Sequence, residues 1–203
     1  MTAEQLGTSL AHVSGPTSDE TPMYAPSTRA PASLVWSQSM VKGVPAGVLT
    51  WTLPLGPTEG PLAFAVHHTM RDHLNEVGSE RYPRFGMMTA LDPRIEGGMH
   101  WRLSFAARLK ESQPAEVEAM LRAAFDSARG QEAVRAHAEA SLKQLEKKQG
   151  GDRWHQWAVQ AAQAGATQPE LMALDPDPFA SITAEHVLEA IHTHVPASTG
   201  EQN

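Results

Sequence analysis

The sequence predicts an α+β fold, in which helices pack on one face of an antiparallel sheet. Apolar and polar residues alternate over residues 47–55 and again over 99–109, which indicates half-buried strands. Apolar residues recur at helical spacing over 61–77 and through most of the chain after Pro114. The expected order is therefore strands, one long helix, more strands and then a run of helices.

Three regions are expected along the chain. Residues 1–33 are predicted to form a short helix and then a linker, which is rich in Ser, Thr and Pro and so favours extended or irregular backbone. Residues 34–197 are predicted to form the α+β domain. Residues 198–203 are predicted to be a disordered tail.

The first two strands are expected at residues 34–41 and 47–55. In the second of them Leu49, Trp51 and Leu53 share one face and threonines occupy the other. This period of two is typical of a strand with one buried side.

A long helix is predicted from Pro61 to Val77, because proline suits the first helical position. Its apolar residues return to one side at helical spacing: Leu62, Val66, Met70, Leu74 and Val77. Gly78 is expected to end the helix, since glycine readily adopts the left-handed backbone of a helix C-terminus.

A second pair of strands is expected at residues 85–91 and 99–109, joined by a turn that contains Gly97 and Gly98. Helices are then predicted from Pro114 to about Gly130 and over residues 131–149. A third helix should follow Asp152 and carry Trp154 and Trp157, and a last one should begin at Thr183.

The two ends of the chain carry similar sequences. Residues 1–6 and 182–187 each combine an N-cap threonine, a glutamate in the first helical turn and an apolar pair that brackets the cap. One interpretation is that a structural unit ends at each place. The alternative is that two unrelated helices share common N-cap chemistry.

Composition excludes several classes of function. Lys and Arg number 16 against 23 Asp and Glu, so the net charge of −7 argues against a general nucleic-acid binder. No apolar run approaches the roughly 20 residues of a spanning helix, and the N-terminus lacks the layout of a signal peptide. The absence of cysteine excludes disulfides and cysteine-ligated metals but does not determine the compartment.

Histidines are the first candidates for chemistry, because His67, His68 and His73 lie with Asp72 on the long helix. Their spacing argues against a zinc pair, which needs side chains that return to one face of the helix. His68 and Asp72 are four apart and are expected to form a surface pair, while His73 points toward the apolar side.

The order of these segments resembles the insulinase/pitrilysin-type zinc peptidases, and in particular one of their non-catalytic C-terminal domains. The stretch Leu74-Asn75-Glu76 followed by Tyr82 is similar to the family's junction between its long helix and hairpin. The helix over residues 154–165 and the turn at residues 182–187 are similar to its later elements.

The resemblance implies a catalytically inactive domain that forms a peptide-binding chamber with a zinc-bearing partner domain. The family's His-x-x-Glu-His motif is absent, so neither a catalytic residue nor a cofactor is expected in this chain, and zinc is implied only in the partner. The substrate-binding residues implied are Tyr82, Asn75 and Arg81. Asn75 stands where the family has arginine, whose charged donors asparagine lacks.

Two other functions compete with this expectation. The acidic charge and the run of helices also suit a stand-alone protein-interaction module without a peptidase role. A metal enzyme built on His68, Asp72 and His73 is the third possibility.

Overall fold

The computed structural model describes residues 31–94, 99–109, 113–147 and 179–196, together with 157–159, 161–162, 166, 169–170 and 177. Several expectations lie outside these residues: the helix and most of the linker before residue 31, the turn at Gly97 and Gly98, Trp154, and the tail after residue 197.

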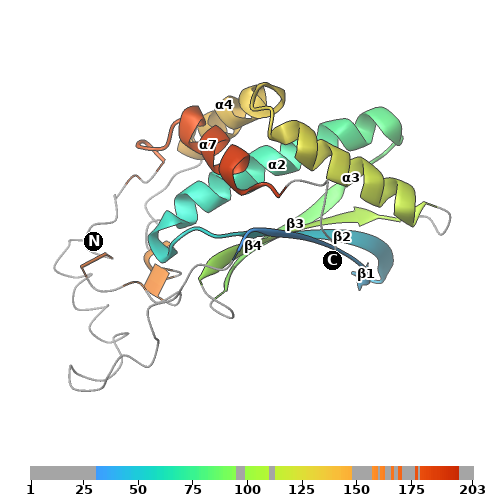
Figure 1. The fold of residues 1–203 in the computed structure, drawn as a ribbon, viewed down its shortest axis with the longest axis horizontal. Coiled ribbons are helices and arrows are strands. Elements are labelled where there is room, and N and C mark those ends of the chain that lie inside the picture. The colour runs from blue at the N-terminus through green and yellow to red at the C-terminus, as the bar shows by residue number, and fades with distance from the viewer. Residues whose placement is uncertain are drawn as a thin grey trace, which may run out of the picture.

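Four antiparallel strands form one sheet, as Figure 1 shows. They are β1 (Ser33–Val41), β2 (Val44–Leu53), β3 (Met87–Arg94) and β4 (His100–Arg108), in the spatial order β1-β2-β4-β3. The expected alternation is confirmed, because Leu49, Trp51 and Leu53 are fully buried on one face of β2. The fold is α+β, as the sequence predicts.

A two-residue turn shifts the first hairpin from its expected position. Lys42 and Gly43 both have positive φ angles, 50° and 75°, which is the backbone of a type I′ turn. Val41 therefore pairs directly with Val44, and β2 begins three residues earlier than the sequence suggests. Gly47 lies inside this strand because the indole ring of Trp36 occupies the space of its missing side chain.

The long helix α2 (Gly60–Arg81) follows a 3₁₀ turn at Pro57–Glu59 and extends beyond its predicted end. Gly78 lies inside the helix, and its carbonyl accepts a hydrogen bond from the backbone N–H of Tyr82. A Cβ atom at position 78 would lie 2.1 Å from the ring of Phe85. The prediction that Gly78 ends the helix is therefore wrong, because close packing, not a left-handed backbone, requires glycine there.

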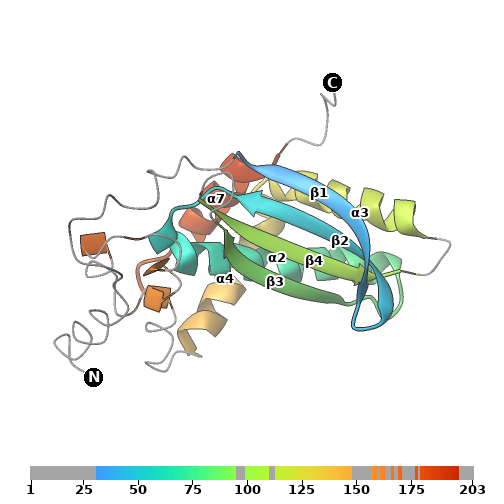
Figure 2. The ribbon, with the colours of Figure 1, turned by 90° about the horizontal axis from the view of Figure 1, so that it is seen from below.

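Three further helices of the described residues lie in the layer above the sheet: α3 (Pro114–Ala128), α4 (Glu132–Lys147) and α7 (Ala184–His194). Seen from below in Figure 2, the strands lie in front of these helices, so the helices cover one face of the sheet. Helix α2 contacts α3, α4 and α7 as well as β3 and β4. It therefore occupies the middle of the helical layer.

Aromatic side chains join the sheet to the helices. Phe125 of α3 makes edge contacts with Trp51 of β2 and Phe105 of β4, with ring centroids 5.5 and 5.7 Å apart. Trp157 is buried against Phe64 of α2, with centroids 5.3 Å apart. Buried aromatic contacts of this kind stabilise a core beyond the area they remove from water.

The last helix begins as predicted. The hydroxyl of Thr183 accepts a hydrogen bond from the backbone N–H of His186, and the His186 ring returns a contact to the Thr183 backbone. The matching sequence at residues 1–6 lies outside the described residues, so the end-to-end repeat stays a prediction. None of the helices described here has both the length and the apolar character that crossing a membrane requires.

Candidate functional site

The residues implied by the family resemblance lie at the C-terminal end of α2. The Arg81 guanidinium lies 5.8 Å above the ring of Tyr82, whose hydroxyl donates to Glu116 on α3 at 3.4 Å. Asn75 is half-buried seven residues before Tyr82, about 10 Å along the helix axis. The structure thus brings Arg81 and Tyr82 together and places Asn75 nearly two turns away.

A different candidate site is the outer edge of β1. In the sheet of described strands, β1 pairs only with β2, so the backbone on its other side has no strand partner. The two-residue turn makes Val41 and Val44 a hydrogen-bonded pair, and such pairs alternate along an antiparallel ladder. The free N–H and C=O groups therefore belong to alternate residues: Leu34, Trp36, Gln38 and Met40.

The β1 strand itself lacks the sequence features that protect an edge from pairing with another strand. Natural edge strands are blunted by lysine, proline, bulges or short length. The sequence of β1, Ser-Leu-Val-Trp-Ser-Gln-Ser-Met-Val, is 9 residues long and has no charge and no proline. Its Val35 and Met40 are 56% and 63% exposed and are the large apolar side chains that stand out to solvent in the described chain.

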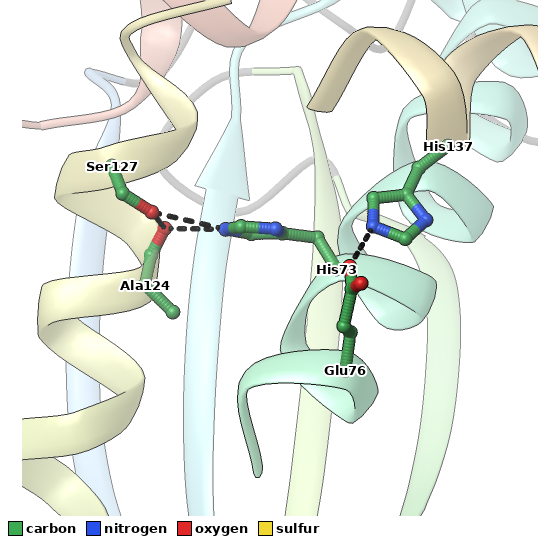
Figure 3. A network of polar contacts seen from close by, with 5 residues as sticks. All are labelled: His73, Glu76, Ala124, Ser127 and His137. Atoms are coloured by element: carbon green, nitrogen blue, oxygen red, sulfur yellow. Dashed lines mark hydrogen bonds and ion pairs between the residues drawn. The ribbon is translucent and has the colours of Figure 1, made fainter. Parts of the chain in front are cut away.

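The third candidate is a cluster of metal-ligating side chains between α2 and α4, drawn in Figure 3. His73 and Glu76 come from α2 and His137 from α4, and one possible ligand atom of each lies within 4.8 Å of the others. The 3-residue spacing places His73 and Glu76 on the same side of the helix. The Nε2 atom of His137 contacts a carboxylate oxygen of Glu76 at 2.6 Å.

The His73 ring is held by α3. Its Nε2 atom lies 3.1 Å from both the Ala124 carbonyl oxygen and the Ser127 hydroxyl oxygen. The Ser127 hydroxyl donates its own hydrogen to the same Ala124 carbonyl at 2.9 Å, so both oxygens act as acceptors for the ring. Nε2 must therefore carry the proton, and Nδ1 presents a lone pair.

The surroundings of His73 favour its neutral form. The residue is 5% exposed, and this burial lowers its pKa below the ordinary value. Its Nδ1 atom is buried and has no hydrogen-bond partner. A buried acceptor without a partner is unfavourable unless a ligand or water completes it.

The expectations for the other residues of α2 have mixed outcomes. His73 is buried on the apolar side, as predicted. Asp72 binds Arg71, the adjacent residue, at 2.7 Å. The structure does not bring His68, Asp72 and His73 together as a group of metal ligands. His73 lies beside Glu76 and His137 instead.

Comparison with known proteins adds no relative: no family model, curated protein or solved structure matches this chain. The resemblance to the insulinase/pitrilysin-type peptidases therefore stays a prediction.

Proposed function

We propose that this protein is an interaction module that binds an extended polypeptide along the outer edge of β1. The observation that carries the proposal is the run of 9 uncharged strand residues whose outward backbone groups have no strand partner among the described residues. Addition of a strand to a sheet edge supplies main-chain hydrogen bonds for affinity, while neighbouring side chains set the sequence preference.

The side chains beside the edge define the expected ligand. Trp36 pairs with the buried Leu49 and so lies on the core-facing side of β1, which Met40 shares because side chains alternate along a strand, while Val35 and Ser37 lie on the opposite face. A bound strand would alternate, with apolar residues beside Trp36 and Met40 and small or polar residues on the open face. The net charge of −7 favours a neutral or basic polypeptide over an acidic one.

The sequence led to two expected functions, a peptide-binding chamber and a stand-alone protein-interaction module. Both involve binding of a polypeptide, and the proposal agrees with them on that point. The role as an inactive wall of a zinc-peptidase chamber, with contacts from Tyr82, Asn75 and Arg81, rests on the resemblance alone. Those residues precede β3, which forms the edge of the sheet opposite to β1. The edge site therefore does not depend on them.

The experiment is selection of binders from a library of random peptides displayed on phage. Selected peptides should show the alternating pattern, and Gln38→Pro should abolish their binding, because proline removes an outward N–H without breaking a bond to β2. A proline at Ser79 would not be a fair control, because Ser79 lies in helix α2. The control is Ser79→Lys, a change at this exposed position, and the variant should bind the selected peptides as the unaltered protein does.

Three outcomes would contradict the proposal. Equal affinity for Gln38→Pro and the unaltered protein would place the peptides elsewhere. Failure to select any peptide whose binding depends on an intact β1 would likewise contradict the proposal. Protection of the β1 amides that grows with protein concentration alone would identify a second copy of the chain as the occupant.

A further inference from the structure

Three side chains that commonly bind transition metals converge where α4 crosses α2. His73 and Glu76 belong to one turn of α2, and His137 approaches from α4, 61 residues after Glu76. Figure 3 shows the His137 ring joined to the Glu76 carboxylate, with the His73 side chain beside them and its ring extending toward Ala124 and Ser127 of α3. Exposure increases across the cluster: His73 is buried, the side chain of His137 is 21% exposed and that of Glu76 is 59% exposed.

His73 has the arrangement of a metal ligand that is oriented from behind. Metal-bound histidines almost always donate their other ring N–H to a carbonyl, a carboxylate or water, which sets the tautomer and the ring direction. Here Nε2–H is directed at Ala124 and Ser127 on α3, and the opposite nitrogen is buried without a hydrogen-bond partner. A ring nitrogen of His73 lies within 4.8 Å of possible ligand atoms of Glu76 and His137, and Nδ1 is the one left available because Nε2–H is engaged with α3.

The contact between His137 and Glu76 is compatible with an ion entering between them. Their ligand atoms are 2.6 Å apart. Nitrogen and oxygen ligands around tetrahedral zinc lie about 2.0–2.1 Å from the metal and so about 3.3 Å from each other. The two side chains would separate by less than about 1 Å, a small movement for a partly exposed carboxylate and imidazole.

We infer that His73 Nδ1, His137 Nε2 and the Glu76 carboxylate bind one divalent transition-metal ion of the zinc class. Two imidazoles and one carboxylate suit zinc, whereas calcium and magnesium prefer oxygen ligands alone. Three protein ligands leave a fourth position open to water. The ion would link α2 to α4 and, through His73, to α3.

The test is a calorimetric titration of the tag-free protein with Zn²⁺. The unaltered chain should bind one ion per molecule, and Glu76→Gln and His137→Gln should each weaken binding by about 100-fold or more. Glu139→Gln is the matched control, because Glu139 is an exposed carboxylate on α4 two residues from His137. It should leave the Kd unchanged.

A second measurement reports on His73 without altering a buried residue. In ¹⁵N NMR spectra of the imidazoles, Zn²⁺ should shift the His73 Nδ1 signal while Nε2 keeps its proton. The inference would be overturned by binding that leaves His73 unperturbed, by ligand variants that bind Zn²⁺ as tightly as the unaltered protein, or by the absence of any heat of binding. Any of these results would make the cluster a contact of His137 and Glu76 beside a buried histidine.

Discussion

The Nε2 atom of His73 on α2 lies 3.1 Å from the carbonyl oxygen of Ala124 on α3, 51 residues further along the chain. This hydrogen bond sets the direction of a buried imidazole, with Ser127 as its second acceptor. The same ring then faces α4 with its other nitrogen. One side chain thus takes part in the contacts of three helices.

Ser127→Ala tests how much the second acceptor orients the ring. Nε2–H keeps its bond to Ala124, so the free energy of unfolding should fall by only about 0.5–1.5 kcal/mol. Zinc affinity should fall by about 10-fold, because a looser ring positions Nδ1 less well. Urea unfolding and zinc titration measure the two effects, and Ser79→Ala on the exposed side of α2 is the control. A loss of stability with unchanged zinc affinity would show that Ser127 is only structural.

Zinc should also stabilise the folded protein. An ion that binds only the folded state raises the free energy of unfolding by about 2.7 kcal/mol at a free concentration of 100 times its Kd. Thermal unfolding with and without Zn²⁺ measures this, and a chelator should reverse the rise. Glu76→Gln should show little response at the same zinc concentration. An equal rise in that variant would place the stabilising ion at another site.

His67 should make the fold sensitive to mild acid. It is 6% exposed, neither ring nitrogen has a hydrogen-bond partner, and burial, followed by the charges of His68 and Arg71, lowers its pKa to about 3. In the unfolded chain its pKa returns to about 6.5. Between these two values the unfolded state binds more protons, so stability falls as the pH falls, by about 1.4 kcal/mol per pH unit from this residue.

His67→Leu isolates that contribution from the other titrating groups. The stability of the variant relative to the unaltered protein should rise steadily as the pH is lowered from about 6.5 toward about 4. Chemical denaturation at a series of pH values gives the difference. A difference that stays constant over this range would contradict the account of His67.

Gly78 and Gly86 form a pair of glycines with opposite expected responses to alanine. At Gly78 the new Cβ would lie 2.1 Å from the Phe85 ring, so the ring must move, and overpacking of this kind costs about 1–3 kcal/mol. At Gly86 no atom beyond its two chain neighbours lies within 4 Å of the new Cβ, and Gly86→Ala should be neutral or slightly stabilising. Thermal unfolding of both variants measures the contrast. A stabilising Gly78→Ala would show that Phe85 does not pack against the helix as described.

Local patterns made most of the fold predictable. Alternation identified the buried faces of β2 and β4, and Thr183 marked the start of α7 because N-cap chemistry depends on neighbouring residues. The end of α2 was not predictable, since the reason for Gly78 is a ring seven residues away that packs back on the helix. The turn at Lys42 was missed because a positive φ at lysine has no strong sequence signal.

The candidate sites were harder to predict than the fold. His137 is a single histidine on a helix, and its meeting with Glu76 depends on how α4 crosses α2. No sequence spacing carries that information. The sequence shows that the 9 residues of β1 lack charge and proline. Only the strand order of the described sheet shows that β1 lies at an edge.

Amide hydrogen exchange along β1 tests the central claim, that this edge is free to accept a strand. Before any peptide is added, Leu34, Trp36, Gln38 and Met40 should exchange rapidly, while Val35, Ser37 and Ser39, which bond to β2, should be protected. A selected peptide should slow exchange at the first set and leave the second unchanged. Protection of both sets in the free protein, or peptide binding that leaves the first set fast, would contradict the account.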